Sequence, residues 1–195
     1  IGQMSLGVKI GEVFTDYSQG ALRETAGKYD LALSGEGFFA VRYVDKNGNE
    51  STKYTRDGNF RLTKDGHVTD VYGNQLRTES GVLQVPLDSE DISIGVDGTV
   101  SVNNQVIDKL KVVDFENYDY IEKFGDNLYQ TVAGATEKES EAQVLQGYIE
   151  QSNVNSVREM VNLITITRAY EAGQKMIQSS DSIMDSAVNS VGRVS

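Results

Sequence analysis

Few residues of this 195-residue chain have types and spacing suited to catalysis. His67 is the only histidine, and cysteine is absent. A Ser-His-Asp triad would therefore depend on His67, and the chain has no thiolate nucleophile, disulfide or cysteine-ligated metal. The 29 acidic residues could supply a carboxylate pair for glycoside hydrolysis, but no pair stands out by its spacing. The chemistry left open is a hydrolase that uses His67 with a nearby carboxylate.

Two short segments resemble metal-binding loops, because each places a carboxylate beside a glycine. They are Asp57-Gly58-Asn59 and Asp65-Gly66-His67. Neither continues with the ligand spacing of an EF-hand, and both are typical of hairpin turns. Gly35-Glu36-Gly37 is neither a P-loop nor a dinucleotide fingerprint, and it predicts a tight turn into a strand at Phe38. We expect no metal, no cofactor, no small-molecule substrate and no enzymatic activity.

These turns lie in a β-rich region that we assign to residues 28–142. Alternating segments such as Ile92, Ile94 and Val96 are separated by Gly- and Asn-containing turns at short intervals, which predicts antiparallel hairpins in a barrel or sandwich. Denser apolar runs predict central strands at Leu31–Leu33, Phe38–Val44 and Leu110–Phe115. Because Phe38 and Phe39 point to opposite faces of a strand, at least one should enter the core.

The segments that flank this region have less apolar character. Residues 1–27 carry five glycines and predict an extended connector, and residues 134–142 read as a charged loop. Residues 143–151 form a return segment that leads to a helix over residues 152–195. The fold class is therefore mainly β with a long C-terminal α-helix, in which an antiparallel barrel- or sandwich-like domain is followed by a helix with a heptad pattern.

The C-terminal helix carries two neighbouring stripes. We predict that the first is an assembly interface, formed by Met160, Leu163, Ile164, Thr167, Tyr170, Gln174, Ile177, Asp181, Met184 and Val188. The second stripe is formed by Ile166, Ala169, Gly173, Met176, Ser180, Ile183 and Ala187. Two seams require more than one neighbour, and polar residues within a seam suit coiled-coil-like interfaces that specify register. The alternative is a helix that folds back on its own domain.

The start of the helix is marked by Asn153 and Asn155, since either side chain can accept a bond from the first turn's backbone N–H groups. Gly173 is the only glycine within the body of the helix. It costs about 1 kcal/mol relative to Ala but lets a neighbouring backbone approach closely. A helix of about 40 residues would be about 60 Å long, which favours partners outside the domain.

The net charge of −11 is unevenly placed. From Asn153 onward, four basic residues balance four acidic ones: Arg158, Arg168, Lys175 and Arg193 against Glu159, Glu171, Asp181 and Asp185. The whole surplus therefore lies in residues 1–152. An acidic body repels nucleic acid and anionic lipid. We therefore expect no nucleic-acid binding. No run of about 18 apolar residues exists, so we also expect no membrane insertion.

Several motifs resemble those of the bacterial flagellar rod and hook protein family, in the expected order along nearly the whole chain. They are Ser18-Gln19-Gly20-Ala21-Leu22, Tyr29–Phe39 (YDLALSGEGFF), Tyr54–Phe60 (YTRDGNF), Leu145–Asn155 (LQGYIEQSNVN) and Arg168-Ala169-Tyr170-Glu171. The motif residues we single out are Asp30, Gly35, Gly37, Phe38, Phe39, Tyr54, Arg56, Asn153, Asn155, Arg168, Tyr170 and Glu171.

The resemblance implies a structural subunit of the flagellar basal-body rod. In this family the terminal helices pack along the inner tube, and a β-rich domain forms the outer wall. The implied partners are copies of the chain and other flagellar rod and hook subunits. The implied location is the basal body, after export to the periplasm or cell-wall layer.

The chain departs from the family pattern at its start, because no N-terminal helix precedes Ile1. We expect a truncated chain whose C-terminal stripes have lost that partner. No large inserted outer domain is present, and the ending Asp185 to Val194 resembles rod proteins of the proximal or distal type. A rod protein is therefore favoured over a hook protein.

A third class of function is a carbohydrate-binding or adhesive β-domain on a coiled-coil stalk, as in a phage tail fibre. The ten tyrosines could form its sugar-binding face, although tyrosines also pack half-exposed on strands. A helix that formed a discrete trimer on its own would support this alternative. An ordinary pKa for an exposed His67 would instead identify that residue as part of a turn and weigh against a hydrolase.

Overall fold

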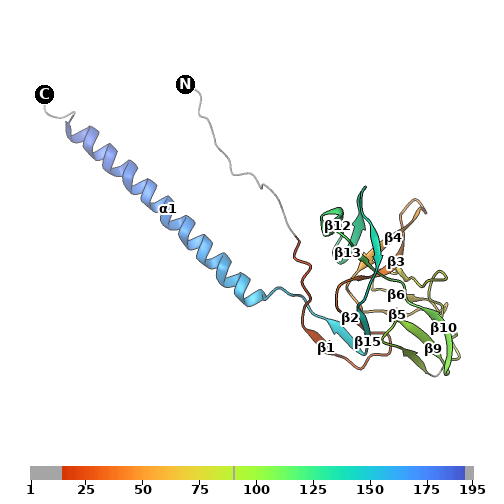
Figure 1. Ribbon diagram of the computed structural model, residues 1–195. Coiled ribbons are helices and arrows are strands. Elements are labelled where there is room, and N and C mark those ends of the chain that lie inside the picture. The colour runs from red at the N-terminus through yellow and green to blue at the C-terminus, as the bar shows by residue number, and fades with distance from the viewer. Residues whose placement is uncertain (1–14, 90, 192–195) are drawn as a thin grey trace. The chain divides into compact units, whose positions relative to one another are not determined.

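The computed structural model describes residues 15–89 and 91–191. The chain divides into two units, Ile1–Asn153 and Val154–Ser195, and each is described by itself. We call them the β unit and the helix unit, because the described part of the first consists of strands with one short 3₁₀ turn, whereas that of the second consists of one α-helix (Figure 1).

Short strands make up the β unit. They are β1 (Leu22–Glu24), β2 (Leu31–Ser34), β3 (Phe38–Val44), β4 (Glu50–Thr55), β5 (Arg61–Leu62), β6 (Val68–Thr69), β7 (Gln75–Leu76), β8 (Ile92–Ile94), β9 (Thr99–Val102), β10 (Gln105–Lys109), β11 (Val112–Phe115), β12 (Ile121–Phe124), β13 (Leu128–Thr131), β14 (Glu137–Glu139), β15 (Gln143–Gln146) and β16 (Tyr148–Glu150). The 3₁₀ turn is Tyr118–Tyr120.

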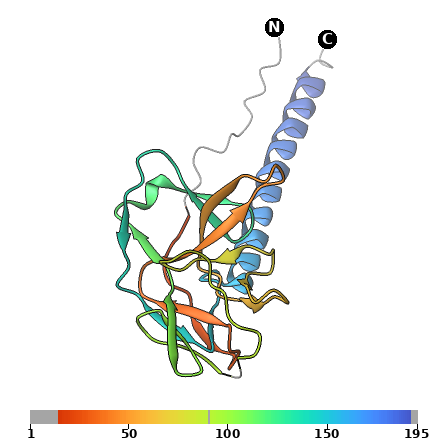
Figure 2. The same ribbon diagram turned by 90° about the vertical axis from the view of Figure 1, so that its right-hand side faces the viewer.

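The largest sheet has nine strands and is organised by the β3–β4 hairpin, drawn in orange in Figure 2. Its main path runs β12-β13-β4-β3-β7-β6-β5, and β11 joins β3 to β14. Three smaller sheets pair β10-β9-β8, β15-β2 and β1-β16. Every described pairing is antiparallel, and the described sheets do not close into a barrel. The mainly β fold with a C-terminal helix is as predicted, without barrel closure.

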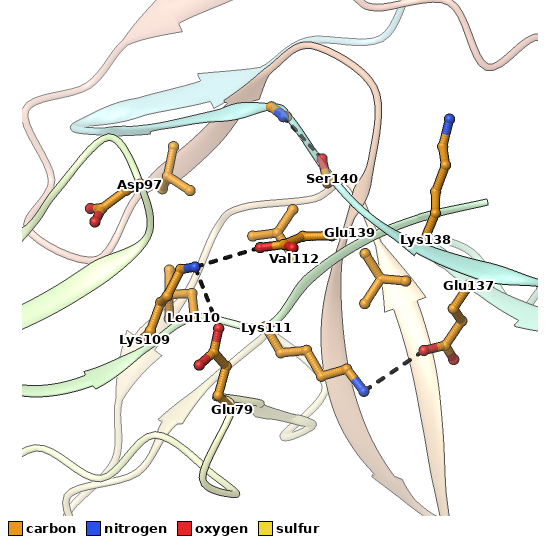
Figure 3. A pocket seen from close by; sticks show the side chains of 13 residues that line it. Glu79, Asp97, Lys109, Leu110, Lys111, Val112, Glu137, Lys138, Glu139 and Ser140 are labelled. Carbon is orange, nitrogen blue, oxygen red and sulfur yellow. Dashed lines mark hydrogen bonds and ion pairs between the residues drawn. The ribbon is translucent and has the colours of Figure 1, made fainter. Parts of the chain in front are cut away.

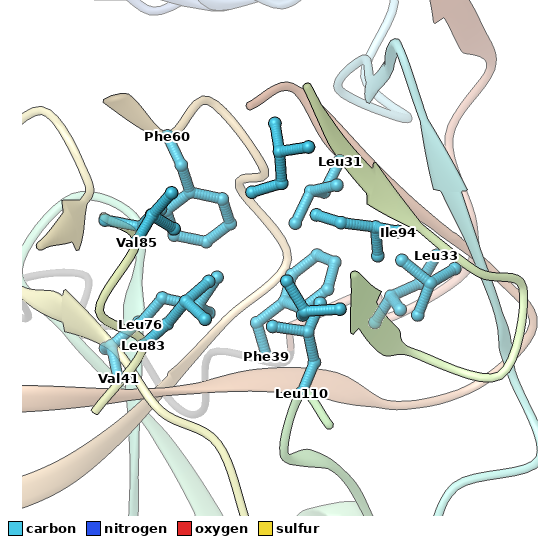
Figure 4. Packing of buried hydrophobic residues seen from close by; sticks show 14 of the residues in the cluster. Leu31, Leu33, Phe39, Val41, Phe60, Leu76, Leu83, Val85, Ile94 and Leu110 are labelled. Atoms are coloured by element: carbon cyan, nitrogen blue, oxygen red, sulfur yellow. The ribbon is translucent and has the colours of Figure 1, made fainter. Parts of the chain in front are cut away.

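Strand β3 separates two apolar cores. Phe39 and Val41 point into a large cluster together with residues from β2, β7 and the β8–β9 hairpin (Figure 4). Phe38 and Ala40 point the other way, into a cluster with Phe115. Residues that alternate along a strand face opposite sides of its sheet, so a run of four buried residues marks a strand covered on both faces. The prediction that at least one phenylalanine is buried is confirmed for both.

One predicted loop is wrong. Residues 134–142 include β14, which pairs with β11 in the register Val113↔Glu139 to Phe115↔Glu137. The strand has no apolar residue, so its pattern did not indicate a sheet. Its charged side chains instead pair with residues of other strands: Glu137 accepts a hydrogen bond from the Tyr54 hydroxyl, and Lys138 lies 2.9 Å from an Asp114 carboxylate oxygen. Hydrophobic alternation misses such an edge strand.

The expected connector also contains structure where it is described. Strand β1 pairs with β16, in the register Leu22↔Glu150 to Glu24↔Tyr148. Tyr17 stacks on Tyr118 with ring centroids 5.1 Å apart, and its hydroxyl donates to the Ile121 carbonyl at 3.1 Å. The start of the described chain is therefore held on the β unit by an aromatic anchor and a short ladder.

The helix unit consists of α1 (Ser156–Val191), whose 36 residues give a length of about 54 Å. Asn155 is its N-cap: the side-chain oxygen accepts from the Arg158 N–H at 3.1 Å, and the carbonyl accepts from the Glu159 N–H at 3.0 Å. Of the two asparagines predicted as caps, Asn155 has this role. Gly173 lies within α1 without interrupting it.

Candidate assembly surface

The predicted assembly residues lie along α1 with exposed side chains. The apolar members are 53% (Ile164) to 73% (Tyr170 and Val188) exposed, and the others in this range are Met160, Leu163, Ile177 and Met184. The polar members Thr167, Gln174 and Asp181 are exposed as well. Within the described part of α1, both predicted stripes therefore consist of accessible side chains. That they form an interface stays a prediction.

Four hydroxyl groups within α1, those of Thr165, Thr167, Ser182 and Ser186, donate to carbonyl groups of the helix itself. The Thr167 hydroxyl donates to the Leu163 carbonyl at 2.8 Å, and Thr165 donates to Val161 in the same way. Such back-bonding gives these polar groups a partner within the helix. The apolar side chains of α1 are exposed, and packing of an apolar face is the main source of helix stability in proteins.

The glycine motif before β3 requires glycine at both positions. Gly35 and Gly37 have φ values of +123° and +140°, which L side chains rarely adopt. A Cβ atom at Gly37 would also overlap the Ser140 hydroxyl. The sequence prediction of a tight turn into Phe38 is confirmed, and the turn aims two carbonyl groups at Arg56.

Arg56 uses its whole guanidinium group. Nη1 donates to the Gly37 carbonyl at 3.0 Å, and Nη2 donates to the Gly35 carbonyl at 3.1 Å. Nε donates to a Glu150 carboxylate oxygen at 2.9 Å. The two side chains of this ion pair are only 14% and 9% exposed. The motif arginine therefore joins the turn before β3 to the end of β16, and Glu150 was not predicted as a site residue.

The other motif residues of the β unit have local structural roles. Asp30 accepts a hydrogen bond from the Thr25 hydroxyl at 2.6 Å. Tyr54 is buried, and this burial raises the pKa of its hydroxyl, as does the hydrogen bond to Glu137. Asn153 donates from Nδ2 to the Asp16 and Ser18 carbonyls, at 3.3 and 3.1 Å. The helical motif residues Arg168, Tyr170 and Glu171 are exposed.

Of the two segments that resemble metal loops, Asp65-Gly66-His67 lies at the hairpin turn between β5 and β6, as predicted. Asp57-Gly58-Asn59 instead connects β4 to β5, which do not pair with each other, so the predicted hairpin turn there is wrong. The Asp57 carboxylate accepts from the Asn59 N–H at 3.1 Å and from the Asn127 side chain at 2.8 Å, so it stabilises this connection. The His67 N–H donates to the Thr63 hydroxyl at 3.1 Å. Among residues 15–89 and 91–191, no group of three or more His, Cys, Asp or Glu side chains could hold a metal ion. No described helix has the length and hydropathy to cross a membrane.

The groove between β10–β11 and β14 has a volume of about 510 Å³ (Figure 3). Lys109 on its rim pairs with Glu79 and Glu139 at 3.4 and 3.8 Å, and Lys111 pairs with Glu137 at 3.8 Å. The apolar residues Leu110, Val112 and Val144 also line the groove. The lining has neither histidine nor cysteine, and its lysines are matched by carboxylates. We see no arrangement of nucleophile, base and orienting group there.

Comparison with known proteins identifies the family. The model "Flagellar hook protein FlgE/F/G D1 domain" matches residues 32–102, and "Flagellar basal body rod FlgEFG protein C-terminal" matches residues 145–190. The chain is 35% identical to the flagellar basal-body rod protein FlgG of Buchnera aphidicola subsp. Schizaphis graminum, over 93% of this chain and 73% of the relative. The chain belongs to the flagellar basal-body rod protein family.

Other rod proteins match over similar lengths. Identity is 35% to FlgF of Caulobacter vibrioides, over 93% of this chain and 73% of the relative. It is 31% to FlgG of Bacillus subtilis, over 96% and 74% respectively. These matches support a structural rod subunit in the flagellar basal body and do not favour a sugar-binding stalk protein. The resemblance of the sequence motifs to this family is confirmed.

Proposed function

We propose that this rod protein assembles through α1, which packs against copies of itself and against other rod and hook subunits. The single observation that carries this proposal is the 36-residue helix with apolar side chains exposed along its described length. Burial of one Leu, Ile or Met side chain gains about 1.5–3 kcal/mol. Seven such or similar residues in one stripe therefore offer a large gain on association.

The polar residues of the first stripe add selectivity to this proposal. Gln174 and Asp181 interrupt the apolar sequence, and an unpaired polar group in a packed seam is costly. Only a neighbouring helix with a hydrogen-bond partner at the same position along the helix axis avoids that cost. The stripe therefore favours one axial register, as expected for subunits stacked in a regular tube.

We further propose that the protein is not an enzyme and binds no small-molecule substrate or nucleic acid. The groove in Figure 3 supports the first two points, since its charges are paired and it lacks nucleophile–base geometry. The net charge of −11, which lies in residues 1–152, supports the third. Export to the periplasm or cell-wall layer follows from the rod assignment and is part of this proposal.

The test compares Ile177→Asp with Ser179→Asp, expressed from the protein's own gene in a strain that lacks it. The two positions are about 200° apart around the helix, so the same charge is placed in the stripe or outside it. Ile177→Asp should abolish swimming and incorporation into purified basal bodies, since it puts an unpaired charge into a packed seam. Ser179→Asp should retain both.

Immunoblots of the cell and of the basal-body fraction separate failed assembly from loss of the protein. If Ile177→Asp were made at normal levels and entered basal bodies as the parent does, α1 would not be the assembly surface. If both variants failed equally, the stripe would not be the part of α1 that matters.

A further inference from the structure

Three segments that lie far apart in the sequence meet around Arg56. They are residues 16–21, where the described chain enters the β unit, the turn at Gly35–Gly37, and residues 148–153, where the chain leaves it. Arg56 bonds to the turn and to Glu150, as described above. The last of these segments directly precedes α1 in the sequence.

Glu150 connects the leaving segment to the entering one. Its Oε2 accepts from Arg56, and its Oε1 accepts from the Gly20 N–H at 2.7 Å. The Gln151 N–H donates to the Ala21 carbonyl at 2.9 Å. One carboxylate therefore joins the arginine of the body, the entering backbone and its own strand, and both of its oxygens are used.

The crossing of the two segments is too close for a side chain. A Cβ atom at Gly20 would overlap the Gln151 carbonyl oxygen. Beyond this point, Asn153 donates to Asp16 and Ser18 across the same pair of segments. Close backbone contact and directional hydrogen bonds on both sides leave a single register for the crossing.

We propose that Arg56 and Glu150 form a lock that fixes the register and direction in which the chain leaves the β unit, and that rod assembly requires this lock. Arg56 is a positioning residue here, because it acts through Glu150 and the backbone. The proposal rests on the assembly function proposed for α1, since residues 151–153 lead directly into that helix.

The Arg56–Glu150 pair fixes how the segments are arranged more than it stabilises the fold. Desolvation offsets most of the attraction in a largely buried ion pair, so its net stabilisation is small. Strands β1 and β16 bond only to each other among the described strands, and a two-stranded ribbon is marginal alone. An arginine fork has three directional donors here, and a lysine ammonium at the end of a flexible chain does not reproduce them.

Hydrogen exchange on the whole chain tests the lock without any assembly. Arg56→Lys keeps the charge but loses the fork, so the Gly20 and Gln151 amides should exchange about tenfold faster. Amides of β3 should be unchanged. The matched control is Arg42→Lys, which alters the more exposed Arg42–Glu50 pair and should leave the Gly20 and Gln151 amides as in the parent. Unchanged exchange at Gly20 and Gln151, or an equal rise throughout β3, would overturn the lock.

A second variant covers the case in which Arg56→Lys fails to fold. Glu150→Gln keeps an acceptor for Gly20 but opposes an amide to Arg56, so it should raise exchange at the same two amides by a smaller factor. No rise in that variant would also overturn the proposal. The double variant that carries Arg56→Glu and Glu150→Arg should not restore the parent exchange rates at Gly20 and Gln151, since a glutamate cannot donate to the Gly35 and Gly37 carbonyls. Parent rates in this double variant would mean that the attraction of opposite charges alone holds the segments together.

Swimming tests the role of the lock. In cells, Arg56→Lys should strongly reduce swimming and incorporation into basal bodies, whereas Arg42→Lys should not. Faster exchange with normal swimming would overturn the positioning role while leaving the lock itself. Failure of the assembly proposal is recognised separately, because it would appear as normal swimming of Ile177→Asp whatever the exchange data show.

Discussion

The β unit and α1 differ in where their polar side chains find hydrogen-bond and ion-pair partners. In the β unit, polar side chains join segments that are distant in sequence, as Tyr54 does with Glu137 and Lys138 with Asp114. In α1, the hydroxyls of Thr165, Thr167, Ser182 and Ser186 bond to the carbonyl three or four residues earlier. The apolar side chains of the two regions differ in burial: Phe39 in the β unit is fully buried, whereas Tyr170 in α1 is 73% exposed.

The two regions obtain their stability from different sources. The β unit has two cores of its own and should fold by burying them. A helix gains most of its stability from the packing of an apolar face, and α1 has exposed stripes instead. The β unit therefore has the buried cores that its own folding requires, whereas the exposed stripes of α1 are the surface for which we propose packing against other chains. Three substitutions test this difference.

The largest effect on folding is expected from Phe39→Ala. Phe39 is fully buried and packs edge-to-face on Phe60 at 5.6 Å, so its loss should destabilise the β unit by about 3–5 kcal/mol. Chemical denaturation followed by tyrosine fluorescence measures this. The matched variant Tyr170→Ala removes an exposed aromatic residue of α1 and should leave the transition unchanged. Equal midpoints for Phe39→Ala and the parent would contradict the two-core description.

An intermediate effect concerns Asp114 and pH. Burial alone would raise the pKa of this carboxyl, but hydrogen bonds from the Tyr118 hydroxyl, Lys138 and the Phe115 N–H outweigh burial and lower it. Because the folded pKa lies below the unfolded value of about 3.9, the stabilisation is complete above about pH 5. It is lost as the pH falls through the folded pKa.

Asp114→Asn tests this assignment. The substitution should cost about 1–3 kcal/mol at neutral pH, since a buried charged acceptor is lost. Its free energy of unfolding should also depend less on pH below about 5 than that of the parent. Denaturation curves at several acidic pH values measure both quantities. Parallel pH dependences in the two proteins would show that another carboxylate carries the effect.

The smallest effect is expected from Gly173→Ala. No atom lies within 4 Å of a Cβ built at Gly173, and alanine favours a helix by about 1 kcal/mol over glycine. Circular dichroism of the dilute protein should therefore show equal or greater helicity and higher thermal stability of α1. If a neighbouring backbone packs on this glycine in the rod, the same variant should assemble less well. Normal assembly would mean that the second stripe is not packed closely there.

The sequence predicted those parts of the fold that depend on neighbouring residues. Strand β3 was found from its apolar run, the turn before it from Gly35 and Gly37, and the start of α1 from its asparagines. Strands β1 and β14 were missed, because exposed strands with charged residues have no alternating pattern. Their partners, β16 and β11, lie far away in the sequence, and only the fold supplies those pairings.

The candidate site was predictable to a similar extent. Heptad spacing located the stripes of α1, since the positions of one helix face follow from the period alone. Arg56 was found as a motif residue, but its partner Glu150 is 94 residues away. No local rule links two charges at that separation. A buried ion pair between such residues depends on how the backbone brings three segments together.

The pairing of β1 with β16 joins the segment that enters the described part of the β unit to the segment that leaves it. A mechanical load applied to one of these segments can therefore pass to the other across this short ribbon and the Arg56–Glu150 contact. This path does not include the core residues around Phe39. The core then need not be stiff for the chain to bear tension, so the tolerance of the β unit to inserted loops and its mechanical strength become separate properties of one polypeptide.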